Sequence, residues 1–100
     1  MDYKVILSPK AIRDLQAIVR YIAPDSPQNA RRFGLTLIEK TKILRAFPEI
    51  GRVVPEFDDP NIREIIFRSY RIVYRVNHEQ KAVEVSRFWH AAKGTQENGA

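Results

Sequence analysis

The sequence predicts an α+β domain in which an antiparallel helix hairpin packs on one face of a sheet. Two Ser-Pro pairs, at Ser8-Pro9 and Ser26-Pro27, each precede a segment with helical spacing of apolar residues. Three runs rich in Ile, Val, Tyr and Phe fill the last third of the chain, as expected for strands. The connections between elements are short, so we expect neighbours in sequence to be antiparallel neighbours in space.

The first elements are a strand, from Tyr3 to Leu7, and a helix that begins at Ser8-Pro9. The serine hydroxyl can accept a hydrogen bond from a free backbone N–H of the first turn, and proline fits the first helical position. Pro24 ends this helix near Ala23. The apolar positions that predict it are Ile12, Leu15, Ile18, Val19 and Ile22.

The second helix is expected to run for about 20 residues from Ser26-Pro27 and to stop at Pro48. Leu35 and Ile43 fall off its main apolar stripe, which leaves them available to a partner. The next segment, Glu49 to Pro60, is rich in proline and acidic residues and is expected to be a loop. The stripe of the helix consists of Ala30, Phe33, Leu37, Leu44 and Phe47.

A three-stranded antiparallel meander is expected over Ile62 to Arg68, Tyr70 to Val76 and Ala82 to Trp89. Alternation in the middle strand places one set of residues on the helix hairpin and the other on the opposite face. The first set is Tyr70, Ile72, Tyr74 and Val76, and the second is Arg71, Val73, Arg75 and Asn77. In the last strand we expect a single face to carry Val83, Val85, Arg87 and Trp89.

Length and composition indicate one globular domain, over residues 1–93, followed by a polar tail at 94–100 that we expect to be frayed. The chain contains no cysteine, which excludes disulfides and thiolate metal sites. No apolar run approaches the ~20 residues of a membrane span, and the N-terminus lacks a signal peptide pattern. We therefore expect a cytoplasmic protein with no membrane association.

The net charge is +5, and its excess is concentrated near the C-terminus. Between Asn61 and Lys93, seven basic residues stand against three acidic ones, a net of +4. Such a field favours an acidic partner, either a nucleic acid or an acidic protein. A basic surface that only keeps the protein soluble is the alternative.

Three stretches and their order resemble the RelE/ParE toxin superfamily. The opening, YKVILSPKAIRDLQAIVRYI, is similar to the family's first strand and helix. The stretch FRSYRIVYRV, from Phe67 to Val76, is similar to its strand pair with a Tyr-Arg-hydrophobic sequence. The stretch VEVSRFWHAAK, from Val83 to Lys93, is similar to the closing strand of ParE-like members, except that Lys93 replaces an arginine and loses its bidentate hydrogen bonding.

The resemblance implies a toxin of a bacterial type II toxin–antitoxin system that a cognate antitoxin neutralises. ParE-like members inhibit DNA gyrase and are not nucleases, whereas RelE-like members cleave mRNA in the ribosomal A site. The sequence is more similar to ParE, so the leading hypothesis is a plasmid-stabilisation type of toxin that binds gyrase. A ribosome-dependent endoribonuclease is the alternative, and an inert family member is a third possibility.

The nuclease alternative depends on four residues. Arg71 matches the arginine that RelE-like nucleases place near the scissile phosphate, and Arg87 is a candidate second cation. His90 is the candidate for proton exchange, and Glu64 is a weaker candidate. The competing interpretation is that Arg71 is solvated, Glu64 pairs with a cross-strand arginine and His90 is structural or exposed. No cofactor is expected, and no metal, because His78 and His90 are isolated from other ligand residues.

The charge and the resemblance also predict which residues contact the antitoxin and which contact the target. We expect the antitoxin to contribute a segment that folds on binding, to cover at least the ~1,600 Å² of a standard interface, and to form a dimer or a heterotetramer with the toxin. An open sheet edge, at the first or the last strand, is a candidate for strand addition. The candidates for contact with the antitoxin are Leu35, Ile43 and Trp89. The alternatives are that Leu35 and Ile43 pack within the monomer and that Trp89 seals the edge of the core. The candidates for contact with gyrase or a nucleic acid are Arg63, Arg68, Arg71, Arg75, Arg87 and Lys93.

Overall fold

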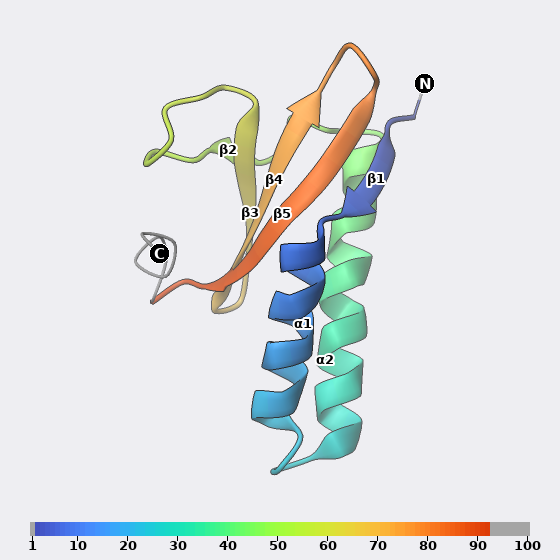
Figure 1. The fold of residues 1–100 in the computed structure, drawn as a ribbon, viewed down its shortest axis with the longest axis vertical. Helices are drawn as coiled ribbons and strands as arrows, with labels where there is room; N and C mark the ends of the chain where they lie inside the picture. The colour runs from blue at the N-terminus through green and yellow to red at the C-terminus, as the bar shows by residue number, and fades with distance from the viewer. Residues whose placement is uncertain (1, 93–100) are drawn as a thin grey trace.

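The computed structural model describes residues 2–92, which form two layers: a helix hairpin and a mixed five-stranded sheet (Figure 1). The strand order in the sheet is β1-β5-β4-β3-β2. The predicted tail, 94–100, and Lys93 lie outside the described residues. The elements in chain order are β1 (Lys4–Leu7), α1 (Pro9–Ile22), α2 (Pro27–Lys40), the 3₁₀-helix η1 (Thr41–Arg45), β2 (Arg52–Val53), β3 (Ile62–Phe67), β4 (Tyr70–Asn77) and β5 (Ala82–His90).

Both helices begin where the Ser-Pro pairs predict. Ser8 Oγ accepts a hydrogen bond from the backbone N–H of Ala11 at 3.0 Å, and Ser26 Oγ accepts one from Asn29 at 3.2 Å. These bonds occupy donors that the first helical turn leaves free, and a proline follows each serine. The local sequence is therefore sufficient to start both helices.

The second helix is shorter than predicted, because α2 ends at Lys40 and the chain tightens into η1. Thr41 Oγ1 donates to the carbonyl oxygen of Ile38 at 2.7 Å, a side-chain bond that competes with the α-helical pattern. Leu44 is fully buried as expected, but Phe47 is 59% exposed, so its assignment to the core stripe was wrong. The change of pitch at Thr41 breaks the periodicity on which that assignment rested.

The predicted meander is confirmed, and β1 extends it. Strands β3, β4 and β5 are antiparallel, and β1 pairs in parallel with β5, with Lys4 opposite Ala82. The last strand is therefore interior, and its prediction as an open edge was wrong. The short strand β2 lies within the segment predicted as loop and forms the other edge of the sheet, beside β3.

A bulge in β5 changes which residues share a face. Val73 on β4 pairs with Arg87, whereas the next residue, Tyr74, pairs with Val85, so Ser86 is the extra residue. An extra residue shifts the alternation of side chains by one position. Val85 therefore joins the core beneath the helices, as does Val83. Trp89, two residues beyond Arg87, packs in a cluster on the other side with Val73, so the prediction of a single face was wrong.

The two faces of the sheet carry two separate cores. The larger lies between the sheet and the helices and includes the fully buried Leu37, Ile72 and Tyr74. The smaller is on the open face, where Val54 covers Val73 and Trp89. No helix within residues 2–92 is both long enough and apolar enough to cross a membrane.

Candidate functional site on the open face of the sheet

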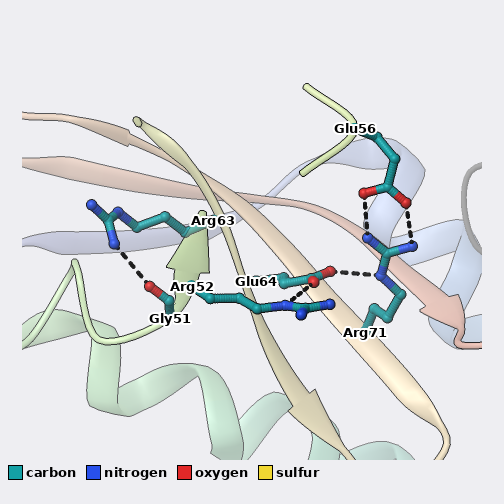
Figure 2. Close-up of polar contacts among 6 residues, drawn as sticks. All are labelled: Gly51, Arg52, Glu56, Arg63, Glu64 and Arg71. Carbon is teal, nitrogen blue, oxygen red and sulfur yellow. Dashed lines mark hydrogen bonds and ion pairs between the residues drawn. The ribbon is translucent and has the colours of Figure 1, made fainter. Parts of the chain in front are cut away.

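A chain of alternating charges lies on the open face of the sheet (Figure 2). Arg71 Nε on β4 donates to Glu64 Oε1 on β3 at 2.6 Å, and Arg52 Nε on β2 donates to Glu64 Oε2 at 2.6 Å. The other end of the Arg71 guanidinium binds both carboxylate oxygens of Glu56, at 3.0 and 3.2 Å. Two arginines and two carboxylates thus neutralise one another within the chain.

The centre of this network is removed from water. The side chain of Glu64 is fully buried and that of Arg71 is 8% exposed. Burial opposes the charge of Arg71, but its hydrogen bonds to Glu56 and Glu64 outweigh this effect and raise its pKa. The bonds from Arg71 are also the main reason why the pKa of Glu56 is lowered. The expectation that Arg71 is solvated was therefore wrong, and Glu64 pairs with an arginine of the neighbouring strand.

Arg87 is held by α1. Its Nε and Nη2 atoms donate to the two carboxylate oxygens of Asp14 at 2.8 and 3.1 Å. Asp14 also accepts the backbone N–H of Phe88 at 2.9 Å. One carboxylate on a helix therefore fixes both a side chain and the backbone of β5, just after the bulge.

Trp89 brings Arg71 and Arg87 together. The two guanidinium carbons lie 5.8 and 5.1 Å from the centroid of the Trp89 ring, within the range of cation–π attraction. The indole is 4% exposed, and its buried Nε1–H has no hydrogen-bond partner among the described residues. Because a buried donor without a partner costs about 1–3 kcal/mol, this group is a candidate for an external acceptor.

His90 is separated from these arginines. Its ring packs edge-on against Tyr70 with centroids 5.2 Å apart, and Tyr70 in turn contacts Phe33 of α2 at 5.5 Å. This places His90 on the side of the sheet that the helices cover. The structure thus brings Arg71 and Arg87 together at Trp89 and binds Glu64 to Arg71, but it does not add His90 to them.

The other arginines predicted to contact a target differ in the interactions that they make with the rest of the chain. Arg63 Nη1 donates to the carbonyl oxygen of Gly51 at 2.9 Å (Figure 2). Its Nε donates to the carbonyl oxygen of Pro60, also at 2.9 Å. Arg75 is 56% exposed and lies 3.9 Å from Asp59. Arg68 lies over the ring of Phe67 at 5.3 Å, in the tight turn between β3 and β4. Arg68 and Arg75 are therefore the members of this set best placed to meet a target.

Sequence reasoning missed Asp14, Glu56 and Arg52. Asp14 looked like an ordinary polar residue of α1, and its partners lie 73 and 74 positions away. Glu56 is one of several acidic residues in a segment predicted to be a loop, where no periodicity indicates which way a side chain points. Within residues 2–92, no three side chains of the metal-binding types are placed to hold a metal ion.

Comparison with known proteins gives the family. The family model of the ParE toxin of type II toxin-antitoxin system, parDE, matches residues 5–94. The chain belongs to the ParE/RelE toxins of type II toxin–antitoxin systems. A search among curated proteins gave no significant match to this toxin.

Solved structures share the fold of the toxin at low sequence identity. The chromosomal ParDE system of P. aeruginosa matches with a TM-score of 0.72 and 22% identity, over 88% of this chain and 95% of that one. The RelBE2 toxin–antitoxin complex of Mycobacterium tuberculosis matches with a TM-score of 0.67 and 22% identity, over 90% and 99%. A mutant of the E. coli toxin RelE in the free state matches with a TM-score of 0.68 and 20% identity, over 98% and 93%. At these identities the likeness concerns the fold.

Proposed function

We propose that this toxin is ParE-like: it inhibits growth in the cytoplasm by binding DNA gyrase, and a cognate antitoxin neutralises it. The family model that matches the chain is that of the ParE toxin, which supports the ParE-like assignment. In this proposal the toxin acts by binding and carries out no chemistry of its own.

The separation of the residues required by a nuclease is the observation that carries the proposal. Cleavage through the RNA 2′-hydroxyl needs a proton acceptor, cations at the phosphate and a proton donor in one place. Here carboxylates of the chain already bind Arg71 and Arg87. His90 packs against Tyr70, on the helix side of the sheet. The geometry therefore favours a binding function over RNA cleavage.

Supercoiling of relaxed plasmid by purified gyrase tests the proposal. Micromolar toxin should inhibit supercoiling, and the Arg68→Asn/Arg75→Ala variant should inhibit it less. Asparagine is chosen because residue 68 has a φ of 54°, which asparagine tolerates. Arg20→Ala/Arg31→Ala removes the same charge from the helix hairpin and should inhibit like wild type. Undisturbed supercoiling at micromolar toxin would refute the proposal.

Primer extension on ribosome-bound mRNA tests the nuclease alternative. Under the gyrase proposal the message stays intact when the toxin is added. New codon-specific 5′ ends that vanish in Arg71→Ala would overturn the proposal in favour of a ribosome-dependent endoribonuclease.

The antitoxin is proposed to cover the helix hairpin. Leu35 is 61% exposed and Ile43 is 44% exposed, which is unfavourable for large apolar side chains in the free toxin. Leu35 lines a groove of about 500 Å³ between α1 and α2. The structures of ParDE from P. aeruginosa and RelBE2 from M. tuberculosis come from systems with an antitoxin, which supports such a partner here. The edge of β1 remains a candidate for strand addition.

A further inference from the structure

A second pocket, of about 570 Å³, lies beside the first turns of α1 and apart from the groove of the helix hairpin. Its walls come from the start of α1, from the open face of β4 and β5, and from the segment that follows β2. Sequence reasoning did not identify this pocket, because its walls are far apart in the chain.

The rim of the pocket is basic. It carries four cations and a single carboxylate, Glu84. Arg87 is engaged by Asp14, and Arg75 lies within 3.9 Å of Asp59. The other two cations make no hydrogen bond or ion pair within residues 2–92, and no acidic residue lies in the first turn of α1 to balance them. The four cations are Lys10, Arg13, Arg75 and Arg87.

The floor of the pocket is apolar, with one polar atom in need of a partner. Phe57 is 38% exposed and forms a wall next to Val73 and Trp89. The Nε1–H of Trp89 is buried and has no acceptor in the described part of the chain. Buried donors in folded proteins are nearly always paired, so this group is suited to an acceptor atom supplied from outside the chain. The pocket thus combines an apolar surface, one donor and two unpaired cations.

We propose that this pocket holds an acidic peptide segment of a partner protein. A carboxylate of the segment pairs with Lys10 and Arg13, an adjoining apolar side chain packs on Phe57, and an acceptor of the segment binds Trp89 Nε1–H. Charge complementarity carries the choice of occupant, because these two cations have no partner among residues 2–92 and the net charge of the toxin is +5.

The acidic residues around the pocket favour a peptide over a nucleic acid. Glu84 lies in the wall, and Asp58 and Asp59 follow Phe57 directly in the chain. A phosphodiester backbone carries a charge at every nucleotide and would meet these acids, whereas a peptide can place one carboxylate at the two free cations. The inference concerns what this pocket holds, so it stands whether or not gyrase is the target.

The fluorescence of Trp89 tests the inference directly, because it is the single tryptophan of the chain and lines the pocket. The probe is a capped eight-residue peptide of alternating Glu and Leu, and the matched peptide has Gln for each Glu. The acidic peptide should change the emission in a saturable way, and the Gln peptide should not. Lys10→Ala/Arg13→Ala should weaken binding about tenfold, since two ion pairs are lost.

A matched variant and a competing ligand complete the experiment. Arg31→Ala/Arg32→Ala removes the same charge from α2 and should leave the affinity for the acidic peptide at the wild-type value. The inference is overturned by a flat titration, by equal binding of the Gln peptide, or by an unchanged affinity of Lys10→Ala/Arg13→Ala. Tighter binding of an oligothymidylate than of the acidic peptide would also overturn it and assign the pocket to nucleic acid.

Discussion

Arg71 on β4 and Glu64 on β3 form a buried ion pair, with 2.6 Å between Nε and Oε1. Each residue also has a second partner of opposite charge, Glu56 for Arg71 and Arg52 for Glu64. Such a pair contributes little compared with apolar side chains, but the loss of one member leaves an uncompensated charge in a buried place. Together, these four residues tie three strands and the loop that carries Glu56 into one cooperative unit.

The Glu64→Gln substitution should lower the free energy of unfolding by about 3–5 kcal/mol, because it leaves Arg71 buried without its closest counter-charge. Urea unfolding followed by circular dichroism measures the effect. Arg75→Ala, which removes an exposed arginine 3.9 Å from its acid, should change the stability by less than about 1 kcal/mol. A Glu64→Gln variant as stable as Arg75→Ala would show that the network does not hold the open face together.

Glu56 should make the stability depend on pH in the acid range. Hydrogen bonds from Arg71 lower its pKa below the ordinary value of about 4.5, so the folded state favours the carboxylate. The stabilisation is then fully present above pH 4.5 and is lost as the pH falls through the lowered pKa. The difference in unfolding free energy between wild type and Glu56→Gln should shrink in this range. A difference that stays constant from pH 7 to pH 3 would contradict the role of Glu56.

Two glycines should respond very differently to alanine. A Cβ at Gly51 would lie 2.5 Å from the carbonyl oxygen of Glu64 and 2.7 Å from Tyr74 Oη, and neither atom can move freely. Gly51→Ala should therefore lower the melting temperature markedly, at a cost of about 1–3 kcal/mol or more. At Gly34 the nearest atom is Val19 Cγ2 at 3.0 Å, and alanine favours a helix, so Gly34→Ala should be close to neutral. Equal effects of the two substitutions would contradict this account.

The exposed apolar residues of the helix hairpin should matter for the antitoxin and little for folding. Leu35→Asp should weaken binding of the co-expressed antitoxin at least tenfold, because a charge would be buried in the interface. Tandem purification and calorimetry measure this. The melting temperature of the Leu35→Asp variant should stay near that of wild type, because Leu35 is 61% exposed. Thr36→Asp, at the neighbouring exposed position, is the control, and equal binding by the two variants would place the interface elsewhere.

Local signals explain what the sequence could predict. Each helix start depends on a bond between residues three positions apart, such as Ser8 and Ala11, and the serine and proline are visible in the sequence. The meander was predictable because a two-residue turn joins β3 to β4 and a short one joins β4 to β5. These features depend on residues that are close to one another in the sequence.

Non-local contacts explain what could not be predicted. The parallel pairing of β1 with β5 joins the two ends of the domain. No pattern in either sequence predicts that these two strands pair. The extra residue Ser86 reversed the faces expected for Arg87 and Trp89, because alternation assumes an uninterrupted ladder. For the candidate site, Arg71 was identified by resemblance and Arg87 as a second cation on the last strand, but two carboxylates that bind them, Glu56 and Asp14, were not identified.

The pairing of β1 with β5 has a consequence for how the toxin is made. Lys4 cannot meet Ala82, nor Asp14 its partner Arg87, until the chain has been synthesised as far as β5. The interior strand β5 is the last of the described elements in the chain, and it lies between β1 and β4, so a chain that stops before it lacks the strand that joins β1 to the rest of the sheet. Contacts between such distant residues also make folding slow relative to that of helical proteins. A fragment that stops before β5 therefore lacks both the strand that pairs with β1 and the arginine that binds Asp14.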